Sequence, residues 1–442
     1  MLIEFSVKNY LCFKDWVTLS MVASPDKEHE EHTFDPETFP ERLLKSCVIY
    51  GANASGKSNL FKAMSFMRRF VVSSSKDRQV KEKTGVTPFR LSTATEGEPS
   101  EFEISFICEG IKYRYGFALD REKVHSEWLF HVPVTREANL FERKGNKFKI
   151  SGRFREGKGL KDKTRDNALF LSVAAQFNGE ISTKILKWFY NFNAISGLQG
   201  YTPVTFKMMD TGYSEKIGKF IKIADLGIEG LSKRILKPSE IDQDFLEFLK
   251  VKIDGFDEEL TEVEMKIPEI QYHHKKFDDE NTQVSIEKFS SNNESEGTQR
   301  LFSLAGPIID TLEEGNILVV DELDCSLHFL IILEILRMFH SKHNKCAQLI
   351  FNCHNTNLLS NKLFRRDQIY FIEKDCFGSS DLYSLYDFKD GDEKVRKDSS
   401  FAKNYVTGKF GAVPHTGDFE ELLLSQKGFD NGTERIEEDK NI

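Results

Sequence analysis

Residues 51–58 read GANASGKS, a glycine-rich octapeptide that fits the pattern G-x-x-x-x-G-K-[ST]. The apolar run from Cys47 to Tyr50 precedes it, and an apolar pattern with helical spacing begins at Leu60. In this strand–loop–helix context the glycines let backbone N–H groups turn inward around phosphate oxygens, and the start of the helix adds positive potential. The octapeptide therefore predicts a phosphate-binding loop in an α/β domain.

The side chains of this loop are expected to bind a nucleoside triphosphate together with Mg²⁺. Lys57 reaches the β and γ phosphates as a point charge, so we count it among the catalytic residues, and Ser58 offers its hydroxyl to Mg²⁺. The loop residues expected to contact the nucleotide are Gly51, Asn53, Ser55, Gly56, Lys57, Ser58 and Asn59.

A second motif lies far along the chain, where the apolar run from Ile317 to Val320 ends on Asp321 and Glu322. Ligands of open parallel sheets bind at the carboxyl ends of the strands, where these carboxylates are expected. One carboxylate is needed near the metal and a second must orient or deprotonate water. We therefore assign Asp321 to the Mg²⁺ shell and Glu322 to the water. In isolation, such a pair has a second interpretation, an acidic turn without a catalytic role.

A third motif, Ser295-Glu-Gly-Thr298, precedes an apolar stripe with helical spacing. Ser295 is expected to cap a helix whose first turn holds Gly297 and Thr298. A hydroxyl and free backbone amides at a helix start form a second anion site. The alternative is a simple helix cap.

A further apolar strand, from Gln348 to Cys353, ends on His354. A histidine at a strand end can bond a phosphate oxygen or the attacking water, and we predict this role for His354. A structural histidine is the alternative.

The remaining sequence alternates between strand and helix patterns. Residues 100–119 alternate apolar and polar around a Glu-Gly turn, which predicts a hairpin, and several helical patterns occupy residues 180–265. The last third alternates helix and strand in the α/β manner. We expect an N-terminal lobe with the phosphate loop, a basic and mostly helical insertion, a C-terminal lobe and a charged tail, at residues 1–120, 121–280, 281–425 and 426–442.

The composition is that of a folded soluble protein, with 39% apolar and 30% charged residues and a net charge of −9. The seven cysteines show no C-x-x-C spacing, which indicates a reducing compartment. The His and Cys residues between His340 and His354 run from a helix end into an apolar strand, so zinc is not expected there. The sequence has no secretory signal and no run of 18 apolar residues. We expect a cytoplasmic protein without a membrane span.

Residues 143–165 carry ten Lys or Arg against two acidic residues, a local charge of +8. This segment predicts a contact with nucleic-acid phosphates or an acidic partner, with Phe148 and Phe154 available to stack on bases. The alternative is a solvated hairpin on the insertion. The negative charge of the whole chain argues against nucleic acid wrapping over its entire surface.

The order of the motifs along the chain resembles that in the ABC-type ATPase head of the SMC/RecF-like branch. The motifs are the phosphate loop, Ser-x-Gly-Thr, the apolar-Asp-Glu strand, Asp324 and a strand-end histidine. Within that branch the chain is similar to compact bacterial ATPases related to abortive-infection and RloA-type defence proteins, in which phrases such as NYLCF and DELDCSLH are familiar. The likeness covers residues 1–120 and 280–415. It implies an α/β fold, with a mixed sheet flanked by helices, and hydrolysis of ATP with Mg²⁺.

The resemblance also implies that two heads share each nucleotide. Ser295, Gly297 and Thr298 would contact the γ-phosphate held by the phosphate loop of the other subunit. Asp324 would belong to a loop that crosses the dimer interface, and His354 would be the switch histidine. The family often has Arg where this chain has Leu11, and we assign no glutamine to the Q-loop.

From this resemblance we expect a homodimer or higher homo-oligomer whose ATP cycle controls a separate effector, a nuclease or toxin, in bacterial anti-phage defence. The alternative is a DNA-repair or chromosome-handling ATPase that acts directly on DNA. A third possibility is a scaffold that binds nucleotide and needs no turnover.

Overall fold

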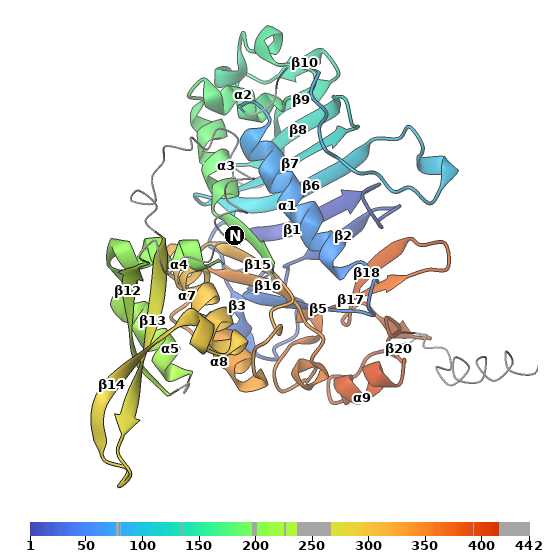
Figure 1. Cartoon of the computed structure of the whole chain (residues 1–442). Helices are drawn as coiled ribbons and strands as arrows, with labels where there is room; N and C mark the ends of the chain where they lie inside the picture. The colour runs from blue at the N-terminus through green and yellow to red at the C-terminus, as the bar shows by residue number, and fades with distance from the viewer. Residues whose placement is uncertain are drawn as a thin grey trace, which may run out of the picture.

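The computed structural model consists of two large sheets with a long helix between them (Figure 1). The predicted tail at 426–442 and the last part of the predicted helical stretch at 180–265 lie outside the described residues. The structure describes residues 1–76, 79, 81–133, 136–196, 201–224, 227–236, 267–391 and 393–414.

The first large sheet has six strands and is parallel except at one edge, where β18 runs antiparallel to β17. Alternate side chains of its strands enter different cores, so that Cys47 and Ile49 face one core and Val48 and Tyr50 face the other. Burial on both faces explains why these strands read as continuous apolar runs. In sheet order the strands are β11 (Phe192–Ser196), β15 (Ile317–Asp321), β16 (Gln348–Asn352), β5 (Ser46–Tyr50), β17 (Ile369–Lys374) and β18 (Ser380–Ser384).

The second large sheet is antiparallel and has seven strands. Its β6–β7 turn lies at Glu109 and Gly110, both with positive φ, as the predicted hairpin requires. Helix α1 (Lys57–Ser73) buries Leu60, Met64 and Met67 in the core between the two sheets. In sheet order the strands are β10 (Lys147–Ile150), β9 (Ala138–Lys144), β8 (Val124–Val132), β7 (Ile111–Leu119), β6 (Ser100–Cys108), β1 (Leu2–Lys8) and β2 (Val17–Ser20).

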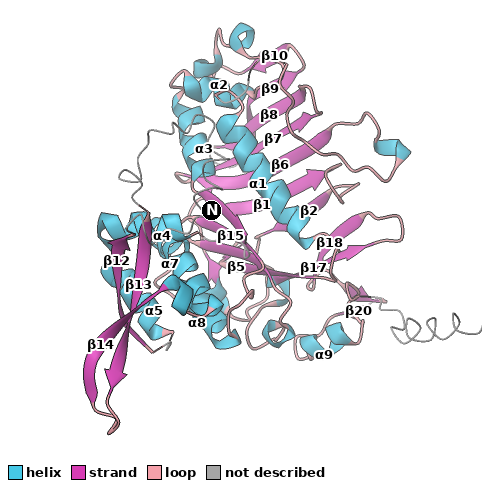
Figure 2. Ribbon diagram, viewed as in Figure 1, coloured by secondary structure: helices cyan, strands magenta, loops and turns pink. Residues whose placement is uncertain are grey.

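The described part of residues 121–280 is not mostly helical, which corrects the sequence prediction. Strands β8, β9 and β10 continue the antiparallel sheet, so the boundary expected after residue 120 falls inside it. A separate three-stranded sheet follows, and its β13–β14 hairpin projects from the molecule (Figure 2). The elements are α2 (Phe170–Gln176), α3 (Glu180–Tyr190), α4 (Thr202–Met208), α5 (Ser214–Ile223), β12 (Ile228–Ile235), β13 (Pro268–Phe277) and β14 (Gln283–Ser290).

Three later helices cover the outer face of the parallel sheet. The helix expected after Ser295 is present as α7, and α8 follows β15; the second core lies between these two helices and the sheet. Among the described residues, no helix is both long and apolar enough to cross a bilayer. The remaining elements are α7 (Glu296–Glu314), α8 (Phe329–His340), α9 (Phe401–Val406), β3 (Thr33–Phe34), β4 (Leu43–Leu44), β19 (Lys389–Asp390) and β20 (Glu393–Lys394).

The basic segment 143–165 lies at the far end of the antiparallel sheet, and it is not exposed throughout. The guanidinium of Arg143 is buried, 3.8 Å from the carboxylate of Glu127. Phe154 is fully buried, so base stacking by this ring is wrong as a prediction. Phe148 is half-buried and packs against Phe170, and stacking by its ring stays a prediction. In the sequence Phe154 lies between two arginines, which indicates an exposed ring, but the ring packs against Phe141 and Phe170 in the core.

Candidate functional site

Three parallel strands end side by side and bring the predicted motifs together. In the sheet, β16 lies between β5 and β15, with Asn352 beside Ile49 and Val320 beside Phe351. The phosphate loop follows β5, and Asp321 ends β15. Because the carboxyl ends of parallel strands meet at one edge, the loop and the acidic motif share one site.

Two glycines make the tight curvature of the loop possible. Gly56 has φ of 119°, and a Cβ there would lie 2.7 Å from the Cys12 sulfur. A Cβ on Gly51 would lie 2.5 Å from the carbonyl oxygen of Ile372 and 2.6 Å from the Ser55 hydroxyl. A side chain at either position would therefore fill or distort the loop.

Lys57 begins α1 with its amine folded back into the loop. Its Nζ donates to the carbonyl oxygens of Gly51, at 2.7 Å, and Ala52, at 2.9 Å. Burial lowers the pKa of the Lys57 amine, and the nearby carboxylates of Asp321 and Glu322 oppose this effect. The amine is thus held at the centre of the loop, where a phosphate is predicted to bind.

The remaining loop side chains lie at different depths. The Ser55 hydroxyl is buried and has no hydrogen-bond partner among the described residues. An orphaned hydroxyl beside two obligatory glycines fits an anion that supplies acceptor oxygens, so these residues suit a phosphate group. Asn53 is exposed at the outer rim of the loop, and Asn59 is half-buried in the first turn of α1.

Ser58, Asp321 and Asn352 form one hydrogen-bonded chain. The Ser58 hydroxyl donates to Oδ1 of Asp321 at 3.1 Å, and Nδ2 of Asn352 donates to the same oxygen at 2.5 Å. The hydroxyl and carboxylate are oxygen ligands of the kind that Mg²⁺ prefers. Asn352 was missed by the sequence reasoning, although a polar residue at the end of a buried strand is a usable signal.

Glu322 follows Asp321 in the left-handed region, with φ of 59°. A residue with a side chain in this region costs about 1–3 kcal/mol, and such strain clusters at functional sites. The Glu322 N–H donates to Oδ1 of Asn352, so one buried amide holds both acidic residues. The turn places the half-buried Glu322 carboxylate beside the site, where a water-activating residue is expected.

Asp324 and His354 are joined within this chain. Oδ2 of Asp324 accepts from the backbone N–H groups of His354, at 2.8 Å, and Asn355, at 3.1 Å. The imidazole of His354 is exposed. The Asp324 carboxylate therefore holds the loop that presents His354.

Ser295 caps α7, as predicted. Its hydroxyl accepts from the Thr298 N–H at 3.1 Å, and a Cβ on Gly297 would lie 2.8 Å from the Ser326 carbonyl oxygen. Ser295 is exposed and Thr298 is buried. Among the described residues, no hydrogen bond joins this helix start to the phosphate loop; its side chains bond within the turn and, through Glu296, to Ser326.

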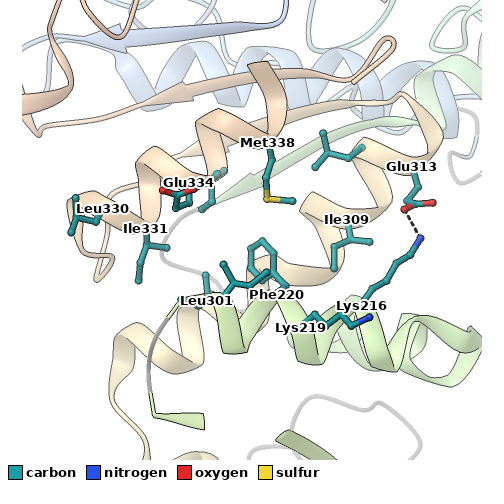
Figure 3. A pocket seen from close by; sticks show the side chains of 14 residues that line it. Lys216, Lys219, Phe220, Leu301, Ile309, Glu313, Leu330, Ile331, Glu334 and Met338 are labelled. Atoms are coloured by element: carbon teal, nitrogen blue, oxygen red, sulfur yellow. Dashed lines mark hydrogen bonds and ion pairs between the residues drawn. The ribbon is translucent and has the colours of Figure 1, made fainter. Parts of the chain in front are cut away.

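Helices α5, α7 and α8 enclose an apolar hollow of about 630 Å³, distinct from the phosphate site. Phe220 and Met338 point into it from opposite helices, and Lys216 pairs with Glu313 at its rim, as Figure 3 shows. The exposed side chain of Leu330 lies at one end.

Comparisons with known proteins give one family match and several distant structural likenesses. Residues 47–360 match the family described as "AAA domain, putative AbiEii toxin, Type IV TA system". No curated protein matches the chain.

Three of the similar solved structures are SMC heads, at 12–14% identity, and each match covers 87% of this chain. One is an SmcHead bound to the C-winged helix domain of ScpA, with a TM-score of 0.41 and 97% of that chain covered. Another is the SMC head domain from Thermotoga maritima, with a TM-score of 0.38 and 98% covered. A third, from the Pyrococcus furiosus complex of an Smc head with the C-terminal domain of ScpA, has a TM-score of 0.38 and 96% covered.

Proposed function

Because this chain belongs to the family of AAA domains described as putative AbiEii toxin, Type IV TA system, we propose that it binds and hydrolyses ATP at the site formed by the phosphate loop and Asp321. The observation that carries the proposal is the hydrogen-bonded chain from Ser58 through Asp321 to Asn352. These hydrogen bonds place the two predicted magnesium ligands, Ser58 and Asp321, in contact, although they are 263 positions apart in the sequence.

The residues divide the chemistry between them. Lys57 leaves its two carbonyl partners to contact the β and γ phosphates, while the loop N–H groups and Ser55 bind phosphate oxygens. When Mg²⁺ is bound, by Ser58 and Asp321, it neutralises charge that develops on the phosphates. Glu322 orients the attacking water and accepts its proton. His354 contacts the γ-phosphate or that water.

The experiment that tests nucleotide binding compares the wild type with Lys57→Ala by titration with Mg·ATP. Loss of a charge-assisted contact worth about 1.5–3 kcal/mol weakens ATP binding at least 10-fold. Lys62→Ala is the matched control, because Lys62 is an exposed lysine on the same helix. Equal affinities in the wild type and Lys57→Ala would contradict the proposal.

We propose further that ATP joins two copies of the chain. The exposed start of α7 offers the Ser295 hydroxyl and the N–H groups of its first turn. In the described part of the structure, no hydrogen bond joins it to the phosphate loop of its own chain. A second copy would place this anion site on the γ-phosphate, with Asp324 at the interface. Light scattering of the Glu322→Gln protein with Mg·ATP tests this proposal. A molar mass that stays at that of one chain after nucleotide is added contradicts it.

We assign control of a separate effector protein, in anti-phage defence, to the apolar hollow. Leu301 and Ile309 of α7 line it, so the helix that begins at the second anion site also forms one of its walls. An amphipathic helix of the effector fits such a surface. With the protein of a neighbouring gene as effector, Leu330→Asp should abolish binding. Phe377→Asp, at another exposed apolar residue, should not, and binding that survives Leu330→Asp contradicts the docking site.

A direct contact with nucleic acid is the second candidate function. It is favoured by exposed cations of the basic segment, among them Lys147, Lys158 and Lys161. Their replacement by alanine should weaken DNA binding and reduce its salt dependence. Replacing the exposed Lys342 and Lys345 serves as the control. Unchanged DNA binding in the variant that lacks the lysines of the basic segment would contradict this second candidate function.

A further inference from the structure

Two histidines and a glutamate face one another at the end of the parallel sheet opposite to the phosphate loop. His29, Glu31 and His32 belong to the segment between β2 and β5, and we call them the histidine cluster. The N–H of Lys45, the residue before β5, donates to the His32 carbonyl oxygen at 2.8 Å. The cluster therefore lies where β5 begins, whereas the phosphate loop follows its end.

The three potential ligand atoms lie close together. Oε1 of Glu31 is 3.5 Å from Nδ1 of His29 and 3.6 Å from Nε2 of His32, and all three atoms lie within 4.8 Å of one another. In a tetrahedral zinc site with bonds of 2.0–2.2 Å, ligand atoms are about 3.4 Å apart. Small side-chain movements would thus bring the three atoms to coordination distance.

The hydrogen bonds on the far side of each imidazole select the tautomer that a metal requires. Nε2 of His29 lies 2.9 Å from the Asn361 carbonyl oxygen, which only accepts, so Nε2 carries the proton. Nδ1, which is 3.5 Å from Oε1 of Glu31, then carries the lone pair. A bond of this kind, from the second ring nitrogen to a carbonyl oxygen, typically accompanies a metal-binding histidine.

His32 is fixed in the complementary way. Its Nδ1 lies 3.0 Å from Oε1 of Gln368, and the Gln368 amide nitrogen donates to the Ser46 carbonyl oxygen at 3.1 Å and to its hydroxyl. This orientation of the amide makes Oε1 the acceptor and Nδ1 of His32 the donor. Nε2 of His32 therefore also presents a lone pair to Glu31.

Two unprotonated ring nitrogens thus lie 3.5 Å and 3.6 Å from one carboxylate oxygen, an arrangement that a cation would stabilise. The ring of His32 stacks on His29, with 4.8 Å between centroids and 11° between the ring planes, and on His340, with 3.6 Å between centroids. Because each lone pair lies in the plane of its ring, one imidazole must rotate for both nitrogens to reach a single ion. The cations close by are engaged elsewhere. Lys45 donates to backbone carbonyl oxygens of α8 and the residue after it, and Arg365 pairs with Asp367 at 2.7 Å.

We propose that His29, Glu31 and His32 bind one transition-metal ion of the zinc type, with the remaining coordination position open to water. Imidazole and carboxylate ligands suit such ions. All three ligands belong to the segment between β2 and β5, and binding to the folded protein alone would raise its stability. This site is independent of the proposed ATPase function.

The test uses the full-length, tag-free protein after chelation and dialysis. Titration with Co²⁺, followed by visible absorption, and with Zn²⁺, followed by calorimetry, should show one site per chain, and Zn²⁺ should raise Tm. His29→Ala and Glu31→Gln should each weaken binding at least 10-fold and remove the Tm shift. His343→Ala, at an exposed histidine outside the cluster, should change neither.

Retained far-UV circular dichroism and ATP affinity would show that the variants are folded. Absence of binding in the wild type would overturn the proposal, since a proton would then satisfy the cluster. Binding of equal affinity in His29→Ala and Glu31→Gln would overturn it as well, because the metal would then lie elsewhere.

Discussion

The amide of Asn352 holds the carboxylate of Asp321, with 2.5 Å between Nδ2 and Oδ1. The other end of the same amide accepts from the N–H of Glu322. One buried side chain therefore positions both the predicted metal ligand and the predicted water-activating residue.

Asn352→Ala should lower kcat for ATP hydrolysis about 10- to 100-fold, with a smaller change in ATP affinity, because partners of metal ligands contribute on this scale. Steady-state phosphate release and nucleotide titration separate the two effects. Asn357→Ala, in the exposed loop beyond His354, is the control. An Asn352→Ala enzyme with unchanged kcat would show that the amide is not needed for positioning.

Gly297→Ala should prevent ATP-dependent assembly without weakening ATP binding by the phosphate loop. An alanine Cβ would lie 2.8 Å from the Ser326 carbonyl oxygen, so the start of α7 must shift. Light scattering with Mg·ATP, in the Glu322→Gln background, measures the assembly. Gly218→Ala is the matched control, because a Cβ on this α5 glycine meets open space. Normal assembly of the Gly297→Ala protein would contradict a role for this helix start.

Glu127→Ala should lower the free energy of unfolding of the part that contains the antiparallel sheet by about 3–5 kcal/mol. This is the usual cost of leaving a buried charge without its partner. The Glu127 carboxylate accepts from the Phe170 and Leu171 N–H groups and lies 3.8 Å from Arg143. Urea unfolding, with the exposed Glu122→Ala as control, measures the difference. A loss below 1 kcal/mol would mean that water or neighbouring groups replace the carboxylate.

Sequence reasoning located the phosphate loop, the Asp321–Glu322 strand end and the cap of α7, because each depends on residues that are close in sequence. It missed Asn352, whose role depends on the register between β15 and β16. Such pairing between distant segments leaves no local pattern.

The same limit explains the errors in residues 121–280. Helical spacing is clear in α3 and α5, but β8, β9 and β10 are specified by pairing with the preceding hairpin. Phe154 lies between two arginines in the sequence, yet its ring enters the core. The histidine cluster was also missed, because its three residues lie in a polar stretch without a helix or strand pattern.

Phosphate release by Glu322→Gln at saturating Mg·ATP is the most direct test of the proposed catalytic site. We expect ATP to bind with affinity close to that of the wild type and turnover to fall at least about 100-fold, because the carboxamide cannot accept the proton of the attacking water. A Glu322→Gln protein that hydrolyses ATP at the wild-type rate would contradict the account.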